Sequence, residues 1–194
     1  MRQFVVVLLL TFTFFQFCSS VFASDIDIGS SKIYPASPFY FLKTVRENIE
    51  MHLAQTPRVK MIRQLEFATR RLREVSSLVS AKREDLISAT LERYWFHIHS
   101  LPDKNPEHLD IAARVKEDLG VDLQFLQRIY PQLSTPTAKM FVRSTINKIL
   151  QRDDVTGDSR KLGCSFLVNE ASSSALNEVE RAILTERAQK CLKI

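Results

Sequence analysis

The chain has 194 residues, of which 45% are hydrophobic and 25% charged, and its 27 basic and 22 acidic residues give a net charge of +5. These proportions exclude a collagen-like, repetitive or charge-dominated disordered protein. Only four residues are glycine, which leaves little from which to build the phosphate-binding loops of nucleotide-binding α/β folds. The composition therefore indicates a globular chain with few tight turns.

The first residues have the pattern of a secretory leader. A basic start is followed by a nearly continuous apolar run over 4–17, and residues 21–23 (Val-Phe-Ala) place small side chains where a signal peptidase reads them. We expect a signal peptide over 1–23 and an exported product, in the periplasm, the cell envelope or outside the cell. An uncleaved anchor normally needs about 20 apolar residues, and the bulky residue before Cys18 disfavours a lipid anchor there. We expect no transmembrane helix after cleavage.

Apolar residues recur at helical spacing through most of the remaining chain, and no stretch alternates with the period of a strand. Residues 24–36 are polar and rich in turn formers, which predicts an extended lead-in. Four prolines mark helix starts, each directly after a Ser, Thr or Asn that can act as the cap. We expect helices from Ser37 to Leu53, from Thr56 to Val79, from Lys82 to Leu101, from Asn105 to Leu133 with a break or kink at Gly120, from Thr135 to Leu150, and from Ala175 to Cys191.

The predicted fold class is all-α. Because the links between the predicted helices are short, they favour an antiparallel helical bundle of about five helices over residues 37–155. A C-terminal helical hairpin follows over 156–194. Residues 153–161 are polar and predict a loop, with Gly163 in the segment before Cys164 and a short turn after it.

Two cysteines, Cys164 and Cys191, lie beyond the leader. Export would place them in a compartment where disulfides persist. A bridge between them would tie the last helix to the preceding turn and stabilise the chain by about 3 kcal/mol on the loop-entropy estimate. The alternative is two buried thiols that stay unpaired.

Two short motifs occupy the start of the first predicted helix and the middle of the second. They consist of Pro35, Ser37, Pro38, Tyr40 and Lys43, and of Ala68, Arg71, Leu72 and Glu74. With these motifs the chain resembles, over about residues 33–150, a bacterial exported family called domain of unknown function 5667. The resemblance implies a helical fold that follows a signal peptide or membrane helix. It implies no activity and supplies no catalytic residues.

The motifs also have a physical interpretation. Pro38 pre-organises the first helical turn, and the stem of Lys43 can cover a neighbouring aromatic face. Arg71 and Glu74 are three residues apart, so their side chains can meet on a helix. Two adjacent helices could also share an ion pair between Glu47 and Arg71. We interpret these residues mainly as specifying the fold, with a binding role as the alternative, because charged helix faces usually face solvent.

Candidate chemistry is weak. His97 and His99 are two apart and point in different directions on a helix, while His52 and His108 could join them only through tertiary contacts. We therefore expect no metal site and no cofactor. The motifs of serine hydrolases, of nucleotide-binding loops and of paired-cysteine redox proteins do not occur. We expect no enzyme, although carboxylates that converge in space, as in an envelope hydrolase, leave no sequence signature.

The first functional hypothesis is a non-enzymatic exported module that binds or supports the cell envelope. Its partner would be an unknown protein or an anionic envelope component, and mixed charge on the helix faces argues against nucleic acid. One alternative is a periplasmic metal or stress sensor that uses the histidines. Another is a secreted effector-like protein, since residues 70–73 match a host-translocation tetrapeptide, a match that is frequent by chance in basic helices. The basic residues to test first are Lys43, Arg70, Arg71 and Arg73.

Overall fold

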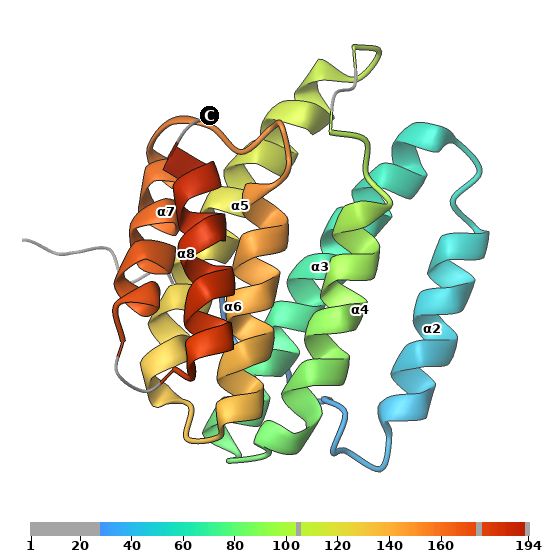
Figure 1. The fold of residues 1–194 in the computed structure, drawn as a ribbon. Helices are drawn as coiled ribbons and strands as arrows, with labels where there is room; N and C mark the ends of the chain where they lie inside the picture. The colour runs from blue at the N-terminus through green and yellow to red at the C-terminus, as the bar shows by residue number, and fades with distance from the viewer. Residues whose placement is uncertain (1–27, 104–105, 174–175, 193–194) are drawn as a thin grey trace, which may run out of the picture.

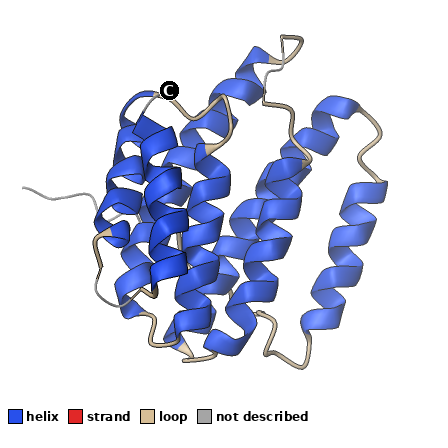
Figure 2. Ribbon diagram, in the orientation of Figure 1, coloured by secondary structure: helices blue, strands red, loops and turns tan. Residues whose placement is uncertain are grey.

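The computed structural model describes residues 28–103, 106–173 and 176–192, and within them the protein is all-helical (Figures 1 and 2). The predicted signal peptide lies outside these residues. In the described part, no helix is both long enough and apolar enough for a membrane crossing. The α-helices are α2 (Tyr40–His52), α3 (Pro57–Ser80), α4 (Ile87–His99), α5 (Leu109–Ile129), α6 (Pro136–Leu150), α7 (Gly157–Ala171) and α8 (Glu178–Leu192), and the 3-10 helices are η1 (Glu84–Leu86) and η2 (Tyr130–Gln132).

Helices α3, α4, α5 and α6 build the core. Their apolar residues recur every three or four positions, so each helix has one stripe that can be removed from water. Helix α4 packs against α3 and α6, while α5 packs against α3 and α7. Helix α2 lies at one edge of the molecule, beside α3 and α4, and α7 and α8 lie at the opposite edge (Figure 1). Fully buried side chains of the core include Leu72, Leu91, Tyr94, Leu123 and Ile146.

Two of the predicted helix starts are confirmed in detail. Thr56 caps α3, with its hydroxyl accepting a hydrogen bond from Val59 N at 3.3 Å, and Thr135 caps α6 in the same way from Ala138 N at 3.4 Å. Each cap is followed by the expected proline at the first helical position. The carboxylate of Glu84 additionally accepts hydrogen bonds at the α6 start. Burial alone would raise the Glu84 pKa, but these hydrogen bonds lower it to about 2.

Other predicted starts are wrong by a few residues. The first helix begins at Tyr40 rather than at Ser37, because residues 35–39 form turns in which Ser37 N donates to Tyr34 O at 2.7 Å. The third begins with η1, since the left-handed conformation of Lys82 ends the preceding helix. The fourth begins only at Leu109, and its predicted cap, Asn105, lies outside the described residues.

The predicted break at Gly120 is wrong. Helix α5 runs through this residue without interruption. A Cβ atom at Gly120 would lie 2.7 Å from Ser159 Oγ on α7, and a Cβ atom at Gly163 would lie 2.7 Å from Leu150 Cδ2 on α6. Both glycines therefore allow close approach of neighbouring helices, and neither marks a break or a loop.

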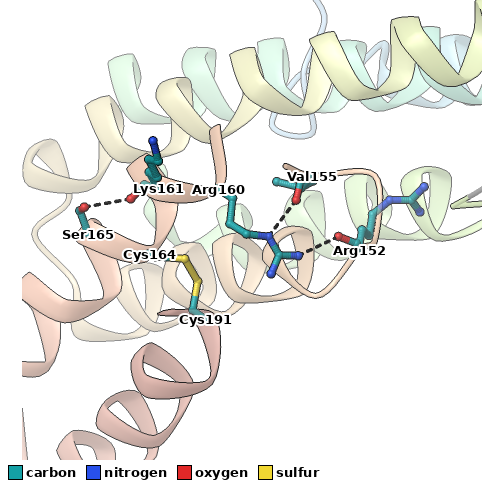
Figure 3. Close-up of a disulfide and its surroundings, with 7 residues drawn as sticks. All are labelled: Arg152, Val155, Arg160, Lys161, Cys164, Ser165 and Cys191. Atoms are coloured by element: carbon teal, nitrogen blue, oxygen red, sulfur yellow. Dashed lines mark hydrogen bonds between the residues drawn. A yellow bond between two sulfur atoms is a disulfide. The ribbon is translucent and has the colours of Figure 1, made fainter. Parts of the chain in front are cut away.

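The predicted loop over 153–161 is correct as far as Thr156 and wrong beyond it, because α7 begins at Gly157. The predicted turn after Cys164 is wrong, since α7 contains the cysteine. Arg160, in the first turn of α7, stabilises the preceding loop, since its Nε donates a hydrogen bond to Val155 O at 2.8 Å. The predicted disulfide is confirmed: Cys164 and Cys191 join α7 to α8, with a Cα–Cα distance of 5.8 Å (Figure 3). Among the described residues, five α-helices thus precede residue 155 and two follow it. Since α7 also packs on α5 and α6, the domain boundary at 155 stays a prediction.

Candidate functional site

The two family motifs meet in space. Tyr40 and Lys43 on α2 contact Arg71 and Glu74 on α3, at the interface between these two helices. Glu74 is completely buried and Arg71 is 2% exposed. The cluster is therefore an internal structure, which contradicts the expectation that Glu74 belongs to a solvated helix face.

The Glu74 carboxylate is the acceptor at the centre of this cluster. Its Oε2 accepts hydrogen bonds from the Tyr40 hydroxyl and from Arg71 NH1, each at 3.1 Å. Its Oε1 lies 2.5 Å from Lys43 Nζ. The Lys43 ammonium thus ends on a buried carboxylate.

Glu47 is the second acidic member of the cluster. Arg71 NH2 donates to both of its carboxylate oxygens, which confirms the predicted interhelical ion pair. Arg70, the next residue along α3, lies 2.9 Å from Glu50 and 3.7 Å from Glu47. Four of the motif residues together with Glu47 form what we call the α2–α3 ion network: Tyr40, Lys43, Glu47, Arg71 and Glu74.

Burial controls the electrostatics of the network. It raises the pKa of Glu74 above the usual value, although Arg71, Lys43 and Tyr40 each act to lower it. It also raises the pKa of Tyr40, assisted by the charge of Glu74. Two cations and two carboxylates balance one another within the network. Such a cluster holds its helices in place because the loss of one member leaves another charge buried and unpaired.

The lead-in is attached to the same network. Lys43 Nζ lies 3.2 Å from Ser31 Oγ and 3.3 Å from Ile33 O. Ser31 and Ser77 exchange two hydrogen bonds, Ser31 N to Ser77 Oγ at 2.8 Å and Ser77 Oγ to Ser31 O at 2.9 Å. The start of the described lead-in therefore lies along α3. The other motif residues either form the turn before α2 or lie in the core: Pro35, Ser37 and Pro38 in the turn, and Ala68 and Leu72 in the core.

Helix α2 turns its charged face inward and its apolar face outward. At 100° per residue, Leu42, Val45, Ile49 and Leu53 fall on the side opposite Tyr40 and Glu47. These four residues, which we call the outer stripe, are 52%, 51%, 54% and 70% exposed. Phe39 and Phe41 flank its N-terminal end and are also exposed. Within α2 only Glu47 is buried, so this helix contributes a carboxylate to the interior and its hydrophobic side chains to the surface.

A groove runs between α2, α3 and α4 and has a volume of about 330 Å³. Phe67 and the half-buried His97 line its base, and His97 Nδ1 lies 2.6 Å from Gln64 Oε1. Burial, assisted by the charge of Arg71, lowers the pKa of His97 to about 4. The histidine is therefore neutral at pH 7. Other residues that line the groove are Thr44, Asn48, Met51, Arg93 and Phe96.

The histidines are not gathered in the described part of the chain. The ring of His99 stacks on Trp95, with centroids 5.6 Å apart, while His97 packs edge-on against Phe67. Across the described ranges there is no group of three or more histidine, cysteine or carboxylate side chains suited to a metal ion. The geometry thus adds nothing to the metal-sensor hypothesis.

The basic residues chosen from the sequence have internal partners. Lys43 and Arg71 belong to the α2–α3 ion network, and Arg70 pairs with Glu50. Arg73 Nε donates to Ile28 O at 2.7 Å. Residues 70–73, the effector-like tetrapeptide, lie in the middle of α3 with Arg71 and Leu72 buried. These side chains hold the lead-in and α2 rather than forming a free basic surface.

A second tyrosine–arginine–glutamate cluster lies at the opposite edge, and the sequence analysis missed it. Arg143 on α6 donates to the Tyr130 hydroxyl at 2.8 Å and lies 3.3 Å from Glu170 on α7 and 3.6 Å from Glu180 on α8. Tyr130 also donates to Glu170. The contacting pairs are 13 to 40 positions apart in the chain, so no local spacing predicts their contact.

The comparison with family models gives one match, to Domain of unknown function (DUF5667), over residues 32–133. The match covers more than half of the chain. The chain belongs to this family. Among curated proteins and among solved structures, nothing matches it. The DUF5667 match contains α2 to α5 with the whole α2–α3 ion network, while α6, α7, α8 and the disulfide lie beyond it.

Proposed function

We propose that this DUF5667 protein is an exported, non-enzymatic helical module of the cell envelope that acts by binding, with the outer stripe of α2 as its contact surface. One observation carries the proposal: the exposed apolar face of α2 is held outward by buried ions. Four hydrophobic residues on one exposed helix face, flanked by two phenylalanines, are typical of an interaction site.

The ion network supports this interpretation because it fixes the orientation of α2. Rotating the helix to bury Leu42 and Ile49 would move Glu47 away from Arg71 and break the ion pair between them. The motif residues of the family therefore serve to present the stripe. The partner would be a protein with an apolar surface or, as the alternative, an anionic component of the envelope. The net charge that would attract it is +5 for the whole chain and +4 once Arg2 has left with the expected leader.

The finer architecture belongs to the same proposal. We propose that the helices alternate in direction as an antiparallel bundle, with α7 and α8 as a hairpin docked on it. The short connections between successive helices and the packing of α7 on α5, α6 and α8 support this arrangement.

Fractionation of cells that express the full chain tests the function. We expect the N-terminus of the product to be Ser24 and the protein to be retained with the envelope after the periplasm is released. Val45→Gln and Ile49→Gln should shift it to the soluble fraction, because a polar side chain weakens an apolar contact. Val179→Gln is the matched control, since Val179 is 69% exposed but lies on α8.

Two results would contradict the proposal. One is a product that is not exported. The other is an exported product whose retention is the same for wild type, Val45→Gln and Val179→Gln, because the outer stripe would then contribute nothing to binding.

A further inference from the structure

We infer that the outer stripe binds a second copy of this chain, so that two α2 helices pair about a two-fold axis. The inference rests on the proposed function, in that it names the occupant of the same surface. Self-complementarity, the size of the apolar surface and its charge all favour this occupant.

The order of residues along the stripe is self-complementary. In two helices that cross antiparallel about a two-fold axis, residues equally distant from the axis face one another. An axis between positions 47 and 48 places Leu42 opposite Leu53 of the second copy. About the same axis, Val45 and Ile49 of the second copy differ in height by one residue, about 1.5 Å along the helix, so each apolar residue of the stripe still meets another.

The same axis also matches charges. Arg46 is 72% exposed beside the stripe and lies 2.6 Å from Glu50 within its own helix. About the axis between 47 and 48, Arg46 and Glu50 of the second copy are offset by one residue, about 1.5 Å along the helix, which long side chains can bridge. Each arginine can therefore exchange or share its carboxylate partner on association, and no like charges are opposed.

The exposed area reaches what a specific pair needs. Two phenylalanines about 60% exposed and four aliphatic residues 51% to 70% exposed present about 500 Å² of apolar surface, on side-chain areas of about 200 Å² for an aromatic and about 100 Å² for an aliphatic residue. Two copies then bury about 1,000 Å², the lower bound for a specific interface. We therefore expect a dimer that dissociates at micromolar concentration rather than an obligate one.

A lipid surface fits the helix less well. Helices that lie in a membrane interface carry several free basic residues on their polar face. The polar face of α2 is instead occupied by the ion network, and the stripe has one exposed cation, Arg46, paired with an anion. Charge attraction to anionic lipid is thus small at this surface.

Sedimentation equilibrium of the full chain, expressed with its leader and purified as the host processes it, tests the inference. Wild type should be a monomer–dimer mixture between about 1 and 100 μM. Val45→Glu places a buried, unpaired charge from each copy near the axis and should weaken dimerisation at least about 100-fold. Val179→Glu should dimerise like wild type, and all three should have the same far-UV circular dichroism and melting temperature, because both valines point to solvent.

Cross-linking tests the orientation. In a mixture of Leu42→Cys and Leu53→Cys chains, a short bis-maleimide should join the two kinds of chain to each other, while either kind alone should give little dimer. Cys164 and Cys191 are bonded to each other, and Cys18 leaves with the expected leader, so the added thiols are the reactive ones in the processed chain.

Wild type that stays monomeric at 100 μM, or a Val45→Glu variant that dimerises like wild type, overturns the inference. Cross-linking within one kind of chain instead of between the two overturns the antiparallel pair. A monomer that binds vesicles of phosphatidylglycerol through Val45 also overturns it, yet leaves the proposed function standing. If the wild type is monomeric but Val45→Gln loses envelope retention, the dimer is likewise overturned and the proposed function stands. The two proposals can therefore fail separately.

Discussion

Helices α2 and α8 occupy opposite edges of the molecule and are attached by different means (Figure 1). Helix α8 buries Leu184, Ala188 and Cys191 and is bonded covalently to α7. Helix α2 buries a glutamate, is held by ion pairs, and leaves its apolar side in water. An amphipathic pattern therefore identifies a helix but does not determine which face is buried, because a set of matched charges can replace the apolar contact.

Of the substitutions that test this difference, Arg71→Ala should change the free energy of unfolding most. The substitution leaves Glu47 and Glu74 buried without their main counter-charge, which costs about 3–5 kcal/mol. Urea unfolding measures the loss. Arg46→Ala is the matched control on the same edge: Arg46 is exposed and pairs with Glu50, so its loss should cost less than about 1 kcal/mol. Equal effects of the two variants would mean that ions do not hold α2.

Asp122 lies on α5, between the two edge helices (Figure 1). Its replacement, Asp122→Asn, should change the free energy of unfolding in a pH-dependent way. Asp122 is buried in α5 and accepts a hydrogen bond from the Tyr94 hydroxyl at 2.7 Å. Burial raises its pKa to about 7, with Tyr94 opposing and Asp118 assisting. The folded protein therefore binds this proton more tightly than the unfolded chain, whose carboxyl has a pKa of about 3.9. Stability from this group is complete below pH 4 and is lost as the pH rises to 7, by up to about 4 kcal/mol.

The amide cannot ionise, so Asp122→Asn should match wild type at pH 4 and exceed it by up to about 4 kcal/mol at pH 8. Chemical denaturation at both pH values measures the difference. The low pKa of His97 acts in the opposite direction, but it is present in both proteins and cancels. Glu117→Gln, an exposed neighbour on α5, is the control. A gain at pH 8 no larger than that at pH 4 would contradict the assignment.

Removal of the disulfide by Cys164→Ala with Cys191→Ala should cost about 3 kcal/mol, from the entropy of the opened loop. Amide hydrogen exchange should become faster in α8 and stay unchanged in α2, which sharpens the difference between the edges. Mass spectrometry without reduction should find one peptide pair that joins Cys164 to Cys191. Two free thiols in the wild type, or faster exchange spread equally over α2 and α8, would argue against this account.

Ile49→Gln should have the smallest effect. Ile49 is 54% exposed, and the substitution should change the free energy of unfolding by less than about 1 kcal/mol in dilute protein. Leu184→Ala on α8, where the side chain is 4% exposed, should cost about 2–4 kcal/mol. Equal losses from these two variants would show that both edge helices bury their apolar faces.

Local signals predicted much of the fold. Thr56 and Thr135 are caps followed by proline, and both helices begin there. The presence of two cysteines beyond the leader predicted the disulfide between Cys164 and Cys191, and the opposite charges of Glu47 and Arg71 predicted an interhelical ion pair. Helix α7 could not be predicted because residues 153–161 have no apolar period. Its position depends on contacts from distant residues, such as Leu150 against Gly163 and the bond to Cys191.

The candidate site could be predicted only in part. The motif residues Tyr40, Lys43, Arg71 and Glu74 were identified, but their burial was not, because spacing alone does not distinguish a solvated charged face from one that faces another charged helix. The available signal was charge matching: Lys43 and Glu47 lie one turn apart on α2, and Arg71 and Glu74 lie one turn apart on α3. That complementarity predicts a contact between charged faces and, with it, an outward stripe.

The reactivity of a single added cysteine tests the outward orientation of the stripe most directly. Ile49→Cys and Val75→Cys are compared in dilute protein by their rates of reaction with a maleimide, each relative to the rate in urea. We predict that the thiol at 49 reacts nearly as fast as in the unfolded chain, while the thiol at the buried position 75 is protected at least about 100-fold. Equal protection at the two positions would contradict the account, since the apolar face of α2 would then be buried.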